Sequence, residues 1–347
     1  MSAINNKACS GVPSPPSRER RVLTIAVRIV AWLVLLIMTG WGTLAVYYSN
    51  LSYAGRLGGS VLFALGSVAV LLYVRPWRRA VAVFLACFAI VVVWWLAIPP
   101  SNDRDWQPDV AVLPYATIDG DRVTIHNIRN IDYRSETDYT VRHYDRTFDL
   151  ATLNRADGYL VYWGSPLIAH TMLSFGFDGD QYVCISIETR KSKGQEYSAI
   201  KGFFKQYELT YVVADERDLV RLRTNYRHED VYLFHLNVKP DIIRKIFLDY
   251  LREVNELKEH PKWYNALTTN CTTDIRTHTV PYNPKARWDW RFIVNGYLDE
   301  YLYKQGMIDQ SLPLAELKKR SYINEKAKQA DGAADFSTRI RQGLPGI

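Results

Sequence analysis

Three apolar runs in the first hundred residues restrict what this chain can fold into more than any other feature does. They extend from Val22 to Tyr48, from Gly59 to Val74 and from Ala80 to Ile98. A helix that crosses a bilayer needs about 20 apolar residues, and the shorter second run can span with tilt or local thinning. The first run is too long for the core of a signal peptide, and no small-residue cleavage site follows it. We therefore predict three retained transmembrane helices over residues 22–99, behind a polar tail at residues 1–21.

The placement of arginine predicts how these helices are oriented. The tail ends in Arg18-Glu19-Arg20-Arg21, and the turn between the second and third runs is Arg75-Pro76-Trp77-Arg78-Arg79. The loop between the first and second runs contains only Arg56. Short loops rich in Lys and Arg stay in the cytoplasm. The N-terminus is therefore expected in the cytoplasm, and everything after residue 100 on the other side of the membrane.

The rest of the chain reads as a linker at residues 100–114 and a globular domain at residues 115–345. The net charge of +7 could suggest nucleic-acid binding, but many arginines flank the apolar runs and no basic cluster interleaved with aromatics stands out in the domain. The four cysteines form no CxxC pair, and the dispersed histidines include no HExxH. We expect no nucleic-acid partner, no metal and no cofactor.

Two strands are predicted around an Asp178-Gly179-Asp180 turn, one from Leu167 to Phe177 and one from Gln181 to Arg190. Alternation directs one set of side chains to the core: Leu173, Phe175, Phe177, Val183, Ile185 and Ile187. The opposite set includes His170, Ser174, Cys184, Ser186, Glu188 and Arg190. His170 and Glu188 then share a polar face, provided that the turn has an odd number of residues, such as three, or a bulge. A carboxylate beside an imidazole orients it as a base and stabilises its protonated form.

Further strands and helices complete an α+β pattern. The other predicted strands are Tyr115–Ile131, Asp157–Tyr162, Phe203–Val213 and Val231–Val238, and the predicted helices are one opened by Pro240, one around Arg291–Gln305 and one around Leu314–Lys326. The charge cluster Asp215-Glu216-Arg217-Asp218 is expected to form salt bridges and caps. The remaining histidines are expected to be structural: His126, His143, His228, His235, His260 and His278.

The segment Thr268-Thr269-Asn270-Cys271-Thr272-Thr273 combines a cysteine with the small polar residues that cap helices. A helix that begins there would place the thiol at the positive end of its dipole, which favours the thiolate and hence nucleophilicity. The alternative is a capping turn with a buried, inert cysteine.

These motifs together resemble the Lnb-type periplasmic domain family of Gram-negative bacteria, over about residues 110–345. The resemblance rests on the order and spacing of five segments: Ala169-His170-Thr171 with Phe175-Gly176-Phe177, Ser186-Ile187-Glu188-Thr189-Arg190, Asp215-Glu216-Arg217-Asp218, Trp263-Tyr264-Asn265 and Asn270-Cys271-Thr272-Thr273. It implies a circularly permuted papain-like (NlpC/P60-type) fold with an antiparallel sheet and packed helices. It also implies a Cys271 nucleophile, a His170 base and Glu188 as the group that orients the base. Asn270, Ser186 and Arg190 are further candidates for completing the site or for contacting substrate.

The family takes its name from a lipoprotein N-acyltransferase, so the resemblance implies a periplasmic acyltransferase domain. Together with the three predicted helices, this makes the chain a multi-pass protein of the bacterial inner membrane. In that hypothesis Cys271 takes an acyl group from a lipid or lipoprotein as a thioester, backbone amides at the start of its helix stabilise the oxyanion, and an amine accepts the acyl group. Arg190 would pair with Glu188 or hold an anionic headgroup.

Two alternatives remain open on sequence alone. The same residues could serve a hydrolase, either a peptidoglycan amidase-peptidase or a thioesterase. The domain could instead be a non-catalytic binding module, in one version with a Cys184–Cys271 disulfide. The sequence predicts neither the acyl donor and acceptor nor the oligomeric state.

Overall fold

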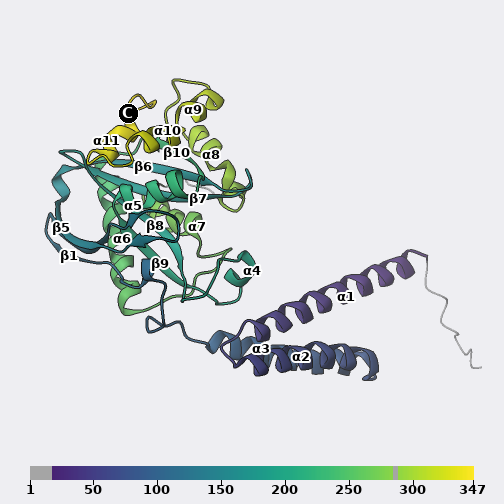
Figure 1. Ribbon diagram of the computed structural model, residues 1–347. Coiled ribbons are helices and arrows are strands. Elements are labelled where there is room, and N and C mark those ends of the chain that lie inside the picture. Colours follow the sequence, from purple (N-terminus) through teal and green to yellow (C-terminus); the bar gives the residue numbers. More distant parts are fainter. Residues whose placement is uncertain (1–17, 284–287) are drawn as a thin grey trace, which may run out of the picture. The chain divides into compact units, whose positions relative to one another are not determined.

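The computed structural model describes residues 18–283 and 288–347 (Figure 1). The chain divides into two compact units, Met1–Ile98 and Pro99–Ile347. The predicted cytoplasmic tail at residues 1–21 lies almost entirely outside the described residues.

The described part of the first unit consists of three helices, α1 (Arg18–Tyr47), α2 (Tyr53–Tyr73) and α3 (Trp77–Ala97). All three are long and apolar enough to cross a membrane. At 1.5 Å per residue, the 21 residues of α2 and of α3 span about 30 Å, the thickness of a hydrocarbon core. Helix α2 is thus longer than the apolar run Gly59–Val74, because it begins at Tyr53, where the side chain of Ser52 caps it.

Close contacts hold the three helices together. Leu35, Leu71 and Phe84, one from each helix, form a buried cluster. A Cβ on Gly42 would lie 2.5 Å from the ring of Phe63, so only glycine permits α1 and α2 to approach this closely there. Most other apolar side chains of the unit are exposed, as expected for a surface covered by lipid.

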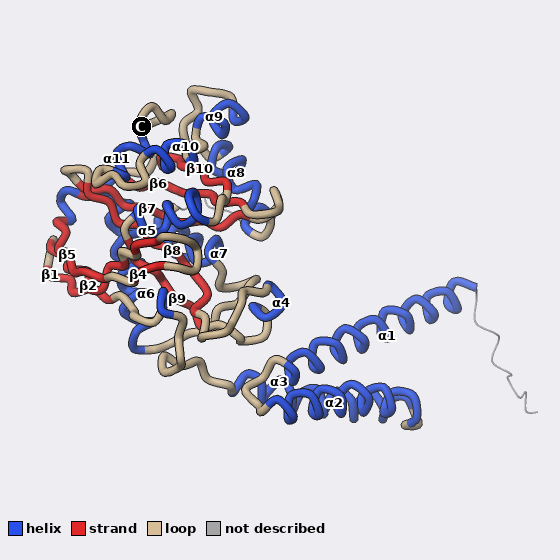
Figure 2. The backbone as a smooth tube through the Cα atoms, viewed as in Figure 1, coloured by secondary structure: helices blue, strands red, loops and turns tan. Residues whose placement is uncertain are grey.

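The second unit is built on an eight-stranded mixed sheet (Figure 2). Its path runs β1-β2-β9-β8-β7-β6-β10, and β5 also pairs with β2. The strands are β1 (Tyr115–Asp119), β2 (Arg122–Arg129), β5 (His143–Asp149), β6 (Leu153–Tyr162), β7 (Ala169–Phe177), β8 (Gln181–Arg190), β9 (Glu208–Ala214) and β10 (Asp230–His235), and a small second sheet joins β3 (Asp132–Tyr133) to β4 (Tyr139–Thr140). All neighbours in the large sheet are antiparallel except β2 and β9, which meet in parallel at Arg129 and Ala214.

Eight α-helices accompany the sheet in the described part of this unit. They are α4 (Ala199–Gly202), α5 (Glu216–Arg221), α6 (Pro240–Glu259), α7 (Cys271–Thr279), α8 (Leu298–Lys304), α9 (Leu314–Arg320), α10 (Asn324–Gln329) and α11 (Phe336–Arg341). A π-helical turn, Leu222–Tyr226, continues α5. The predicted α+β class with packed helices is therefore confirmed, although the sheet is mixed rather than purely antiparallel. The permuted papain-like topology stays a prediction.

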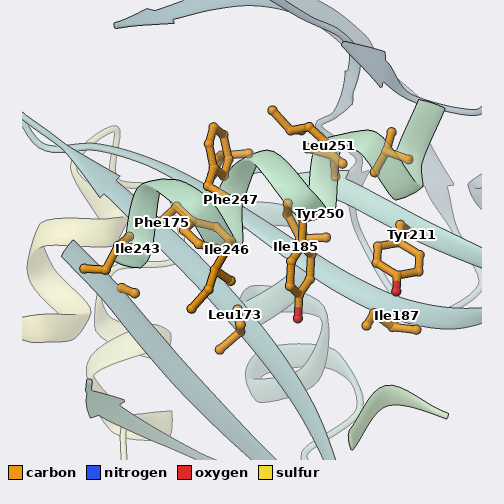
Figure 3. Packing of buried hydrophobic residues seen from close by; sticks show 14 of the residues in the cluster. Leu173, Phe175, Ile185, Ile187, Tyr211, Ile243, Ile246, Phe247, Tyr250 and Leu251 are labelled. Carbon is orange, nitrogen blue, oxygen red and sulfur yellow. The ribbon is translucent and has the colours of Figure 1, made fainter. Parts of the chain in front are cut away.

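The main core lies between the sheet and α6 (Figure 3). Helical spacing on α6 turns one apolar stripe toward the sheet: Ile243, Ile246, Phe247, Tyr250 and Leu251. Opposite them lie the side chains that alternation predicted to face the core on β7 and β8, among them Leu173, Phe175, Ile185 and Ile187.

The other sheet face was expected to be polar, but much of it is buried. Met172, Cys184 and Val212 pack there with residues of α5, α10 and α11. The ion pairs of Arg341 with Glu216 and Asp157 fasten α11 to this face, with closest N–O distances of 2.6 and 2.8 Å. The C-terminal helices therefore cover the face that alternation predicted to be polar.

Some boundaries differ from the prediction for local reasons. Residues 115–131 form a hairpin, because Gly120 turns the chain at a φ of +57°. The helix predicted over Leu314–Lys326 is split, because the backbone at Ser321 and Ile323 pairs with the edge of β10. The predicted linker is packed on the domain, where the indole of Trp106 is buried.

Candidate active site

The β7–β8 hairpin places His170, Ser186 and Glu188 together. Phe177 pairs with Gln181 across a turn of three residues, and the register continues to Met172 opposite Ser186. Extending the same register by two residues brings His170 opposite Glu188. The odd turn that the shared face required is therefore present, with Asp180 at a φ of +56° and Gly179 at +72°.

A chain of hydrogen bonds connects these three side chains. Ser186 Oγ donates to Glu188 Oε1 at 2.8 Å, and His170 Nε2 lies 2.7 Å from Ser186 Oγ. An ionised carboxylate only accepts, so the serine hydroxyl must donate to Glu188 and can only accept from the imidazole. His170 therefore carries its proton on Nε2, which leaves Nδ1 with a lone pair. This tautomer is the one that a general base needs if Nδ1 faces the nucleophile.

Arg223 is the charged partner of Glu188. Its Nη2 lies 2.6 Å from Glu188 Oε1, and its Nη1 lies 3.2 Å from Glu229 Oε2. Burial by itself raises the pKa of Glu188, but the charges of Arg223 and His170 and the hydrogen bond from Ser186 hold it well below its usual range. Glu188 is therefore ionised at neutral pH, as the direction of the hydrogen-bond chain requires.

Arg190 does neither of the two things expected of it. It is buried away from Glu188, where Nε donates to the carbonyl of Val110 and Nη1 to Asn102 Oδ1. Its guanidinium lies 4.1 Å from the ring centroid of Trp106. The guanidinium of Arg190 thus binds the segment that was predicted to be a linker. Because its donors point there, Arg190 does not form part of the candidate site.

Cys271 is the first residue of α7, as predicted. The side chain of Asn270 caps this helix and accepts hydrogen bonds from the amides of Thr272 and Thr273 at 3.0 Å each, and Thr273 completes a capping box. The amide of Asp274 donates to the carbonyl of Asn270. Cys271 N–H is thus the one first-turn amide without an acceptor in the described structure. The predicted oxyanion site of several helix-start amides is reduced to this donor, because Asn270 occupies two of the others.

Asn295 ties the histidine strand to the cysteine helix. Its Oδ1 accepts from the amide of Ala169 at 2.9 Å, and its Nδ2 donates to Thr272 Oγ1 at 2.7 Å. These contacts fix the residue before His170 and the residue after Cys271 through one buried side chain. Gly296 makes the approach possible, since a Cβ there would lie 2.0 Å from the carbonyl oxygen of Pro166.

Cys271 and His170 line one cavity of about 390 Å³, here called the polar cavity. Its walls also include two further site candidates, Glu188 and Asn270, and other charged and aromatic side chains, among them Arg223, Arg227, Tyr264 and Trp163; Ser186 and Arg190 are not among its lining residues. Among residues 18–283 and 288–347, no hydrogen bond joins the Cys271 thiol to His170. Catalytic hydrogen bonds are often long before substrate binds, so the shared cavity is the relevant geometry.

Burial favours the neutral forms of both Cys271 and His170. Burial raises the pKa of the Cys271 thiol, and hydrogen bonds from the Thr171 backbone and from Thr272 offset only part of this. Burial also lowers the pKa of His170 to about 3, with a further lowering by Arg223 that outweighs the opposite effect of Glu188. Burial thus opposes the thiolate that the helix dipole favours, because both groups lie out of water.

Cys184 and Cys271 are both free thiols, so the described structure does not contain the disulfide considered above. The reason is their position, since Cys184 packs in the cluster beneath α5 and α11 and Cys271 in the core with α6. In the described segments, no group of three or more His, Cys, Asp or Glu side chains is arranged to hold a metal ion.

Sequence reasoning missed Arg223 and Asn295. Arg223 lies in the π-helical turn after the quoted charge cluster, and nothing in its spacing pointed toward Glu188. Asn295 lies 24 residues after Cys271 in an irregular segment of 3-10 turns. The pair Asn295-Gly296 is a signal that could have been noticed, because glycine beside a polar residue in a non-repetitive segment indicates close backbone approach.

Comparison with known proteins supports the predicted family. Residues 139–296 match the family model of the Lnb N-terminal periplasmic domain. The matched segment of this chain contains His170, Ser186, Glu188 and Cys271. The resemblance inferred from the motifs is thereby confirmed for this part of the chain. No curated protein and no solved structure matches the chain. Together with the three apolar helices, the match describes a membrane-associated protein with a periplasmic domain.

Proposed function

We propose, for a chain whose residues 139–296 belong to the Lnb N-terminal periplasmic domain family, that the second unit is a cysteine acyltransferase anchored in the bacterial inner membrane by α1–α3. One observation carries this proposal. Cys271, at the start of α7, shares a cavity with His170, whose tautomer is set by Ser186 and Glu188. This is the constellation that nucleophilic catalysis needs: a nucleophile, a base and a group that orients the base.

In the first half-reaction His170 Nδ1 accepts the thiol proton while Cys271 Sγ bonds to the carbonyl carbon of a lipid ester. Cys271 N–H donates to the oxyanion. The carbon–oxygen bond to the alcohol then breaks, and the imidazolium returns its proton to the leaving oxygen. The products are a thioester on Cys271 and the free alcohol.

In the second half-reaction an amine, such as the N-terminus of a lipoprotein, attacks the thioester carbonyl. Its proton passes to His170, the carbon–sulfur bond breaks, and the proton is returned to Cys271 Sγ. The imidazolium formed in each half-reaction lies near Glu188, whose Oε1 is 3.6 Å from His170 Nε2. Because burial disfavours the charged forms of both groups, proton transfer is expected to accompany attack.

The surroundings of the polar cavity suit a lipid substrate. Trp163, Ile168 and Ile293 line it and are 42%, 44% and 49% exposed, and Leu167 beside them is also exposed. Exposed apolar side chains gathered at a cavity mark an interaction site. The membrane helices end at Ala97, shortly before the domain begins, so the chain itself keeps the domain at a bilayer.

Mass spectrometry of the full chain, isolated from membranes, tests the proposal. We expect an acyl adduct on Cys271 that neutral hydroxylamine removes, that is absent from His170→Ala and that persists in Cys184→Ala. An amine acceptor should discharge it. Absence of any adduct in the presence of ester lipids would contradict the proposal. Release of free fatty acid at the same rate with and without the amine would instead identify a hydrolase that uses the same residues.

A further inference from the structure

A second cavity, of about 280 Å³, lies in the core on the α6 side of the sheet. We call it the apolar cavity. Its walls come from β6, β7, β10, α6, α7 and the segment near α8, and most are hydrocarbon, including Leu160, Leu173, Phe175, Ile243, Ile246 and Phe292. Polar groups such as Asn237 and Lys239 also belong to its lining. The reaction proposed above does not use this space.

The two cavities meet at the nucleophile. Thr171 and Thr272 line the apolar cavity, and the residues that precede them, His170 and Cys271, line the polar cavity. The two threonine hydroxyls lie 3.4 Å apart, and Thr272 Oγ1 is 3.9 Å from Cys271 Sγ. The contact between these two side chains therefore lies between the thiol and the apolar cavity, so an acyl chain that reaches Cys271 from this cavity has to displace it.

A cavity of about 150 Å³ lined by similar side chains stays dry and binds benzene, so the apolar cavity has room for a larger hydrocarbon. Each methylene moved from water into such a site strengthens binding about fourfold. A linear hydrocarbon is thus the ligand that the lining favours, and the few polar groups exclude a peptide or sugar, whose many hydrogen-bonding groups would lack partners.

We propose that the apolar cavity binds the hydrocarbon tail of a long fatty acyl group whose carbonyl carbon is presented to Cys271 in the polar cavity. This rests on the proposed function for the position of the carbonyl, but binding of the tail is a separate property. The cavity, rather than the reacting groups, then selects the length of the acyl chain.

Gly158 on β6 gives a way to fill the apolar cavity. It lines the cavity, and the nearest side chain to a Cβ there would be that of Leu236, at an ordinary 3.5 Å. Gly158→Leu therefore occupies the space meant for the tail, and Gly158→Ala fills it partly. Gly332 is the matched control, since a Cβ there meets nothing within 4 Å and the residue is not part of the cavity lining.

The test uses the full chain with Cys271→Ala in phosphatidylglycerol nanodiscs, so that no thioester can form. The probe is palmitic acid with a terminal diazirine, and cross-linked peptides are mapped after irradiation. We expect labelling of peptides that contain Ile243, Ile246 or Phe292, competed by palmitate but not by butyrate. Labelling should fall at least tenfold in Gly158→Leu, fall less in Gly158→Ala and stay unchanged in Gly332→Leu.

Labelling confined to α1–α3, or equal in Gly158→Leu and Gly332→Leu, would overturn the proposal. The graded Gly158→Ala variant keeps the result interpretable if leucine disturbs the fold. The two hypotheses fail separately. Tail binding without any Cys271 adduct in the wild type refutes only the acyltransferase, and an adduct without cavity labelling refutes only the tail site.

Discussion

Replacement of Asn295 by alanine is expected to weaken the fold and the candidate site together. The change deletes the hydrogen bonds to Ala169 N and Thr272 Oγ1, each worth about 1 kcal/mol net. For the buried Ala169 amide, which is left without an acceptor, a desolvation cost of about 1–3 kcal/mol takes the place of that net value. The expected loss of unfolding free energy is therefore about 2–4 kcal/mol, or a shift of about 1 M in the urea midpoint. Because this side chain also aligns β7 with α7, the reactivity of Cys271 should fall about tenfold or more.

Two cysteines provide both readouts in one sample of the full chain. Cys184 is fully buried, so its alkylation along a urea series reports unfolding, whereas Cys271 alkylation without urea reports site reactivity. Asn255→Ala is the matched control, since Asn255 also bridges with two side-chain hydrogen bonds, both to Ala116 and away from the site. The control should lower stability and leave Cys271 reactivity unchanged. The reasoning is refuted if Asn295→Ala, like the control, lowers stability but leaves the reactivity of Cys271 unchanged.

Three further predictions concern buried ionisable groups. Each is measured as the free energy of unfolding, by alkylation of Cys184 along a urea series. Arg223→Met leaves Glu188 and Glu229 without their guanidinium and should cost about 3–5 kcal/mol of stability; a loss below 1 kcal/mol would contradict this. The pKa of His170 is lowered to about 3 from about 6.5 when unfolded, so its contribution is complete above pH 6.5 and is lost as the pH falls toward 3. His170→Phe should therefore lose less stability than wild type between pH 6.5 and 4. Burial and the charge of Glu253 raise the pKa of Asp274 to about 7, so its contribution is full below about pH 3.8 and is lost as the pH rises through 7. Asp274→Asn should remove that decline, and an unchanged pH profile would disprove it.

Much of the site could be predicted because it depends on local rules. The period-two alternation and the three-residue turn place His170, Ser186 and Glu188 on one face, and the polar residues around Cys271 identify a helix start. Both signals lie within a few residues of the groups they position, so no tertiary information is needed to use them.

The rest depends on contacts between distant segments. Arg223 reaches Glu188 across 35 residues, and Asn295 reaches Ala169 across 126. Contacts between distant segments also explain why Arg190, a predicted site residue, is not part of the site. Its strand face was assigned correctly in register, but the segment at residues 102–111 packs over it and takes its guanidinium. Burial, which determines whether Cys271 and His170 are charged, likewise follows from the packing of the whole domain.

The most direct test of the account is the rate at which an alkyne-bearing thiol electrophile alkylates Cys271 in intact membranes. Wild type is compared with His170→Ala and with His260→Ala, which removes an exposed histidine at the end of α6. If His170 is the base for Cys271, its removal slows alkylation at least tenfold, whereas His260→Ala reacts at the wild-type rate. Equal rates in all three proteins would mean that His170 does not act on the thiol, and the acyltransferase assignment would be wrong.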